Sequence, residues 1–225
     1  MQIIAADETR LIDLPGVGPC PRPVDIDQSV TGFASLKSLR IYRFAPAVTI
    51  EGESEADEVY VVPVGGAVRM QIGGAHPLEA TLSETGHRAL YMTPQHAYRL
   101  TPGSQVQVAY ARAAATGAVA CHVIEGRRGD RAEALAFDAA DLAEGATLIH
   151  DARRERLIHV ISGALDVGGV SVASTGTIAL AAGEAAWTCR GFWCRSFDSV
   201  LCSKGDEPWD KHGRMNFVRM RCGSR

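Results

Sequence analysis

Two stretches of this chain repeat one pattern, in which a β-branched run reaches a glycine and continues as a short alternating strand. The first pair of repeated stretches covers residues 58–70 and 156–169, and a second pair covers residues 89–100 and 177–187. Aligning Gly65 with Gly163 gives an offset of 98 residues, and aligning Tyr98 with Ala186 gives 88. A weak internal duplication with one ten-residue deletion explains both offsets.

Short apolar runs separated by glycine-containing turns predict an all-β fold with almost no helix. One set of strands is expected between residues 38 and 115, and a second between about 147 and 202. Between them, residues 126–145 are polar and rich in alanine, which predicts a linker in which 138–144 form a short helix or turn. The expected domains are therefore 1–125, with a leading loop segment, and 146–225.

Charge and hydrophobicity indicate which kinds of partner this chain is not expected to bind. The formal net charge of −3 gives no reason to expect nucleic acid or an anionic membrane as a partner. No apolar run reaches the roughly 18 residues that a membrane span requires. The first residues lack the basic-then-apolar pattern of a signal peptide, so a cytoplasmic protein is expected.

The duplicated pattern resembles the cupin superfamily, whose unit is a small double-stranded β-helix or jelly roll. The resemblance implies two tandem cupin-like barrels, a bicupin. Typical cupins carry His-x-His, then three or four residues before a Glu and six more before a Gly, and a later Pro-x-Gly-x-x-His. These side chains would place three imidazoles and one carboxylate around a divalent metal at the barrel mouth.

The first repeat lacks the histidines of this motif. Counted from Gly65, the carboxylate position falls on Glu58 and the third histidine on Tyr98, while the His-x-His positions fall on Gly52 and Ser54 or, with the longer spacing, on Glu51 and Glu53. A transition-metal site is not expected from these residue types.

The second repeat has lost more of the motif. Counted from Gly163, the two histidine positions and the carboxylate position fall on His150, Ala152 and Arg156, and Ala186 stands where the last histidine belongs. A lone histidine beside an arginine does not make a transition-metal site. We therefore predict no bound metal and no cofactor in either half.

A more specific resemblance covers residues 38–115. The stretches 89–102 and 106–115 are similar to the metal-free half of the 5-deoxy-glucuronate isomerase and 5-keto-4-deoxyuronate isomerase family, with a tyrosine near the end of the proline turn and a strand ending in alanines. The resemblance implies activity on sugar acids. The metal-bearing, histidine-rich segment of that family has no counterpart after Gly126.

Polar residues near the expected mouth of the first barrel are the candidate site. Glu58 and Tyr98 are the candidate catalytic acid and base, and the candidate ligand-binding residues are Glu51, Glu53, His96 and Arg99. A solvated acidic turn across 51–58 is the competing interpretation.

The predicted function is that of a degenerate bicupin that lacks the usual metal ligands. It would bind a small polar or carboxylate ligand in an accessory or sensing role. One alternative is a sugar-acid isomerase or lyase that uses the Glu, Tyr and His side chains as acid and base. A second alternative is a structural module that forms a homodimer through edge strands.

Overall fold

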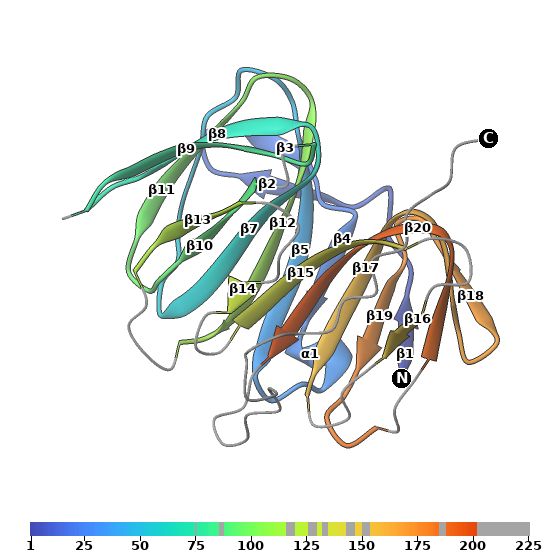
Figure 1. The fold of residues 1–225 in the computed structure, drawn as a ribbon. Coiled ribbons are helices and arrows are strands. Elements are labelled where there is room, and N and C mark those ends of the chain that lie inside the picture. Colours follow the sequence, from blue (N-terminus) through green and yellow to red (C-terminus); the bar gives the residue numbers. More distant parts are fainter. Residues whose placement is uncertain are drawn as a thin grey trace.

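The structure is a computed structural model. It describes residues 1–74, 76–85, 88–115, 120–125, 130–131, 135–142, 147–149, 154–184 and 188–201. Two large antiparallel sheets, one β-hairpin and a four-residue helix, α1 (Gln28–Thr31), make up the regular structure of this part of the chain (Figure 1). The prediction of an all-β fold is confirmed.

The first large sheet has ten strands. Its order is β4 (Val24–Asp27), β5 (Leu36–Phe44), β12 (Val106–Ala114), β7 (Asp57–Gly65), β10 (Arg88–Met92), β9 (Leu78–Ser83), β8 (Ala67–Ile72), β11 (Ala97–Pro102) and β6 (Ile50–Glu53), with β13 (His122–Glu125) beside β10. β5 and β6 lie near opposite ends of this order, yet Phe44 and Ile50 share one buried cluster. The sheet therefore curls around that cluster, as a barrel wall does.

The second large sheet has eight strands. Its order is β1 (Gln2–Ile4), β19 (Thr177–Leu180), β17 (Arg156–Val167), β20 (Thr188–Leu201), β15 (Leu135–Leu142) and β14 (Asp130–Arg131), with β16 (Thr147–Ile149) beside β20 and β18 (Val170–Ala173) beside β17. The start of the chain thus contributes a strand to the sheet of the second repeat. The hairpin of β2 (Leu11–Leu14) and β3 (Gly18–Pro21) packs against the core of the ten-stranded sheet through Cys20.

The linker prediction needs one correction. Residues 138–144 were expected to form a helix or turn, but β15 continues to Leu142 and pairs with β20 along its whole length. The pairing with a long neighbouring strand overrides the weak local preference of alanine for helix. No feature of the described residues tests the boundaries 1–125 and 146–225, which stay predictions.

The two faces of the ten-stranded sheet bury different clusters. Along β7, Val59 and Val61 point to the concave face, around which the sheet curls, and Tyr60 and Val62 point to the convex face. All four are buried, which explains the continuous apolar run in the sequence. The convex face packs against the eight-stranded sheet, because Leu135, Leu157 and Ala179 join the same cluster as Tyr60 and Val62 (Figure 1).

A buried carboxylate joins the two sheets. Glu155, just before β17, accepts hydrogen bonds from the backbone N–H groups of Ala34, Ser35 and Leu36 at 2.5, 3.0 and 2.9 Å. Ala34 and Ser35 lead into β5 of the other sheet, and Leu36 is its first residue. A carboxylate that accepts several N–H bonds is a strong, charge-assisted contact. Glu155 therefore fixes the first repeat to the second.

No helix in the described part of the chain has the length and apolar character that a membrane span requires.

Candidate functional site

Backbone conformation fixes the register of the first repeat. In the turn between β7 and β8, Gly66 has a φ of 86°, whereas Gly65 lacks a positive φ. In the second repeat, Gly163 has a φ of 81°. The glycine that corresponds to Gly163 is therefore Gly66. Counting seven residues back from Gly66 moves the carboxylate position from Glu58 to Val59.

The structure brings four residues of the first repeat to the expected metal-ligand positions. Val59 lies on the concave face and is fully buried. On β6, Ile50 belongs to the concave cluster, so by the two-residue period Gly52 and Ser54 face the same way. Gln95 has a φ of 61°, so it stands at the glycine position of the Pro-x-Gly-x-x-His motif. Counting three residues on puts Tyr98 at the position of the third histidine.

Tyr98 fills the space that Gly52 leaves open. The two residues are direct partners across β11 and β6. A Cβ atom on residue 52 would lie 2.5 Å from the Tyr98 hydroxyl oxygen and 2.6 Å from the ring carbon that carries it. The absence of a side chain at Gly52 therefore leaves the space that the Tyr98 ring fills. A histidine at residue 52 would require Tyr98 to move.

These four residues do not fit a divalent metal. Glycine and valine have no donor atoms, and the Ser54 hydroxyl is already engaged, because it donates to the Thr93 carbonyl at 2.7 Å and accepts from the His96 N–H at 2.9 Å. Within the described residues, no three His, Cys, Asp or Glu side chains lie close enough to hold an ion. The positions of the second-repeat motif at His150, Ala152 and Ala186 lie outside the described residues.

Three tyrosines occupy the concave face in place of the ligands. The Tyr110 ring lies 5.4 Å from that of Tyr42, edge to face, and 6.1 Å from that of Tyr98. Burial raises the pKa of the Tyr98 hydroxyl, and it raises the pKa of Tyr110 well above the usual value. Both hydroxyls therefore stay protonated at neutral pH and can donate hydrogen bonds.

The Tyr110 hydroxyl is buried and has no hydrogen-bond partner among the residues that the structure describes. An interaction with the Tyr98 hydroxyl contributes to the raised pKa of Tyr110 as a hydrogen bond would, although the two oxygens do not reach normal hydrogen-bond geometry. A buried donor without a partner costs about 1–3 kcal/mol of stability. Such a donor is unusual in a well-packed core and marks a position where a further polar group fits.

Arg112 lies on the same face of β12, two residues after Tyr110. Its Nη2 donates to the Glu53 carbonyl at 2.8 Å, while its Nη1 lies 3.4 Å from the Glu55 carboxylate and 3.6 Å from that of Asp57. The buried Asp57 also pairs with Lys37. The positive charge of Arg112 lowers the pKa of both Tyr98 and Tyr110, opposing the effect of burial. The Arg112 side chain is 18% exposed, so it is partly accessible to solvent.

The predicted catalytic pair is not brought together. Glu58 is fully buried on the opposite side of β7 from Val59, and its carboxylate accepts a hydrogen bond from the Tyr91 hydroxyl at 2.7 Å. Tyr91 belongs to the cluster between the two sheets, whereas Tyr98 packs on the concave cluster. A single small substrate could not touch Glu58 and Tyr98 from opposite faces of one sheet.

The predicted ligand-binding residues are also dispersed. Glu51 and Glu53 are exposed, and Arg99 donates to the Glu51 carboxylate through Nε at 3.0 Å and Nη2 at 2.6 Å. His96 is partly buried, and its Nδ1 lies 3.0 Å from the Thr93 hydroxyl and 2.9 Å from the Pro94 carbonyl. The exposed positions of Glu51 and Glu53 agree with the solvated acidic turn, but Asp57 and Glu58 of the same stretch are buried. A ligand-binding role for Glu51, Glu53, His96 and Arg99 stays a prediction.

Sequence reasoning missed Tyr42, Tyr110 and Arg112. The alternation of β12 offered a signal, because Val108, Tyr110 and Arg112 share one side of a strand by the two-residue period. Nothing in that pattern distinguishes the concave face from the convex one, however, since Ala109 and Ala111 are equally buried.

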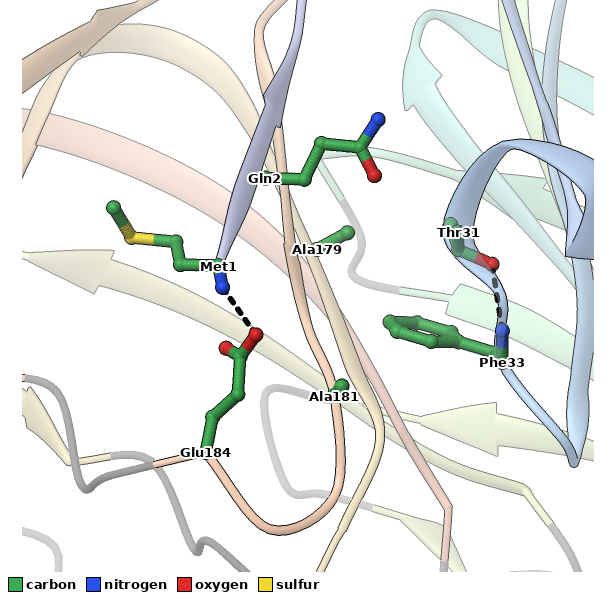
Figure 2. Close-up of a pocket in the computed structure, with 7 residues that line it drawn as sticks. All are labelled: Met1, Gln2, Thr31, Phe33, Ala179, Ala181 and Glu184. Carbon is green, nitrogen blue, oxygen red and sulfur yellow. Dashed lines mark hydrogen bonds and ion pairs between the residues drawn. The ribbon is translucent and has the colours of Figure 1, made fainter.

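A shallow pocket of about 150 Å³ lies elsewhere, where β1 meets β19 and the turn after α1 (Figure 2). Its lining residues are Met1, Gln2, Thr31, Phe33, Ala179, Ala181 and Glu184. The amino group of Met1 pairs with the Glu184 carboxylate at its edge. Because these opposite charges neutralise each other, the pocket presents no strong recognition group.

Comparison with known proteins establishes the fold. No family model matches the sequence, and no curated protein matches it. Among solved structures, the chain is similar to protein Ylba from Escherichia coli, with a TM-score of 0.73, 15% identity and coverage of 91% of this chain and 92% of that one. A cupin 2 conserved barrel domain protein from Leptotrichia buccalis gives a TM-score of 0.53 at 14% identity, with 89% and 92% covered.

A third similar structure is the bacterial pirin YhhW from Escherichia coli, solved in complex with nickel(II). It gives a TM-score of 0.65 at 12% identity, with 89% of this chain and 98% of that one covered. At these identities the likeness shows the fold alone. The chain has the cupin fold.

Proposed function

We propose that this cupin-fold protein binds a small carboxylate ligand without a metal ion, at the concave face of the ten-stranded sheet. Arg112, Tyr98 and Tyr110 are the residues that would contact the ligand. In this proposal the chain is a degenerate bicupin, each repeat forming one barrel, and it acts in an accessory or sensing role. The observation that carries the proposal is the buried Tyr110 hydroxyl without a partner.

The chemistry of the three groups suits a carboxylate. A guanidinium group and a phenolic hydroxyl together supply a positive charge and several N–H and O–H donors for two carboxylate oxygens. Arg112 is already oriented by the Glu53 carbonyl, so little side-chain entropy is lost on binding. Arg112 pairs with the exposed Glu55 and with Asp57, which it shares with Lys37, so a ligand carboxylate would replace Glu55 beside the guanidinium group.

Tyr110→Phe gives the most specific test of the proposal. Because this change removes a buried donor without a partner, the free energy of unfolding should rise by about 1 kcal/mol in the absence of ligand. Carboxylate binding should weaken at the same time. Opposite effects on stability and affinity are typical of a residue retained for function.

Isothermal titration calorimetry with a panel of small carboxylic acids, including sugar acids, measures the affinity, and uncharged sugars of similar size serve as negative probes. Arg112→Gln should weaken the best carboxylate about tenfold or more. Arg69→Gln is the matched control, because Arg69 is exposed and pairs with Glu79 on β8 and β9. The proposal is wrong if no acid binds saturably, or if Arg112→Gln binds as tightly as the natural chain.

A further inference from the structure

We propose a second binding site, for a phosphate group, where three arginines converge on one aspartate at the edge of the ten-stranded sheet. The arginines are Arg10, Arg22 and Arg40, and the aspartate is Asp25 of β4. They come from four separate segments: the residue before β2, the residue after β3, β4 itself and β5. The cluster borders the carboxylate site, because Arg40 is the cross-strand partner of Tyr110 and Tyr42 packs against Tyr110, but different guanidinium groups would bind the two anions.

The contacts show how the cluster is held. Arg22 donates through Nη2 to the Asp25 carboxylate at 2.7 Å, and Arg40 donates through Nε at 3.2 Å. Nη1 of Arg10 lies 3.4 Å from the same carboxylate and 3.4 Å from the Asp25 backbone carbonyl. Asp25 therefore acts as a common anchor that orients three guanidinium groups.

The cluster has more N–H donors than its own residues satisfy. Three guanidinium groups face Asp25 and, at 3.9 Å from Arg10, the half-exposed Asp7. Asp27 of β4 also interacts electrostatically with Arg40, so the arginines and the nearby carboxylates balance in number. The Nε of Arg22 is buried and has no hydrogen-bond partner among the described residues. These N–H groups can donate hydrogen bonds to a further anion.

A tyrosine adds a neutral donor beside the cluster. The guanidinium of Arg22 lies over the Tyr42 ring, 5.7 Å from its centre, and its Nη1 is 3.4 Å from the Tyr42 hydroxyl. Stacking on an aromatic ring restricts the arginine to a fixed plane. The side chains of Arg10 and Arg40 are 38% and 37% exposed, so an anion can reach the cluster from solvent.

A phosphate suits this arrangement better than a carboxylate. The three guanidinium groups approach from different chain segments, and a tetrahedral phosphate presents three or four acceptor oxygens in different directions. Its charge of about −1.5 to −2 at pH 7 exceeds that of a carboxylate. The phosphate would bind on the solvent side of the guanidinium groups, opposite Asp25.

Isothermal titration calorimetry with inorganic phosphate, at constant ionic strength, tests the site. We expect saturable binding of one phosphate, weakened at least tenfold by Arg10→Gln and by Arg40→Gln. Asp25→Asn should instead strengthen phosphate binding several-fold, because it removes a competing negative charge. A cluster with a structural role alone would show no gain of phosphate affinity in Asp25→Asn.

Two controls separate this site from other sources of anion binding. Arg69→Gln removes an exposed arginine that pairs with Glu79 on β8 and β9, and it should leave phosphate binding unchanged. Arg112→Gln should also bind phosphate normally, although it should lose the carboxylate. Absence of saturable phosphate binding, acetate binding that Arg10→Gln weakens as much as it weakens phosphate binding, or an equal loss in Arg69→Gln would each overturn the proposal.

Discussion

Replacing Glu155 with alanine is expected to lower the free energy of unfolding by about 3–5 kcal/mol, measured by urea denaturation. The substitution removes a charged acceptor shared by the N–H groups of Ala34, Ser35 and Leu36. Leu36 is buried, whereas Ala34 and Ser35 are exposed, so the main cost is the lost charge-assisted contact at the buried end of the turn. Because this turn joins the two large sheets, the loss should affect the whole fold.

Glu51→Ala provides the comparison for this prediction. Glu51 is also a glutamate with two hydrogen bonds to its carboxylate, but its side chain is 66% exposed and its partner is Arg99. Exposed pairs of this kind contribute about 0–1 kcal/mol. If Glu155→Ala destabilised the protein no more than Glu51→Ala, the carboxylate would not join the sheets.

Acidification from pH 7 to pH 5 is expected to destabilise the protein by about 2 kcal/mol through His159 alone. This side chain is 3% exposed, its Nδ1 lies 3.0 Å from the Thr177 hydroxyl, and burial lowers its pKa from 6.5 to about 4. Between these two values the unfolded chain binds a proton that the folded chain excludes. Stability therefore falls as the pH falls from 6.5 towards 4, by about 1.4 kcal/mol per pH unit.

The measurement is the free energy of unfolding at pH 7 and at pH 5, for the natural chain and for His159→Gln. Glutamine can still bond to Thr177 but does not titrate. The variant should lose about 2 kcal/mol less than the natural chain over this interval. Equal losses in both proteins would show that His159 is protonated in the folded state.

The strands could be predicted because the evidence for them is local. The buried run of β7 and the alternation of β8 are confirmed, as are the glycine turns. The site could not be predicted as well, since a shift of one residue between Gly65 and Gly66 moves a strand residue from one face to the other. That shift separates Glu58, between the sheets, from Val59, inside the curl of the ten-stranded sheet.

Contacts between segments far apart in the sequence could not be predicted from local sequence patterns. Glu155 meets backbone groups about 120 residues earlier in the chain, and any of several acidic residues could have served. The same holds for Asp25, whose three arginines come from separate segments. Residue type and spacing cannot identify such partners, because only the folded chain brings them together.

The two alternative functions stand differently. An acid-base enzyme that used Glu58 and Tyr98 would need a substrate that reaches both faces of the ten-stranded sheet, because Glu58 bonds to Tyr91 between the two sheets and Tyr98 packs on the concave cluster. A homodimer through edge strands remains a prediction, and its test is the molar mass in solution. Neither alternative accounts for the Tyr110 hydroxyl, which the carboxylate proposal explains.

The central claim is that Gly52, Ser54 and Tyr98 occupy the histidine positions of a cupin metal site. Zinc titration of two triple variants tests it directly. One variant carries Gly52→His, Ser54→His and Tyr98→His, and the other carries Glu51→His, Glu53→His and Tyr98→His. Removing the tyrosine ring makes room at residue 52, and three inward imidazoles suffice to hold zinc.

The account predicts that the first variant binds one zinc ion per chain, at least a hundredfold more tightly than the second. The second variant has the same number of introduced histidines, but those at 51 and 53 lie on the exposed face of β6. Equal affinity in the two variants, or a folded first variant that binds no zinc, would contradict the assignment.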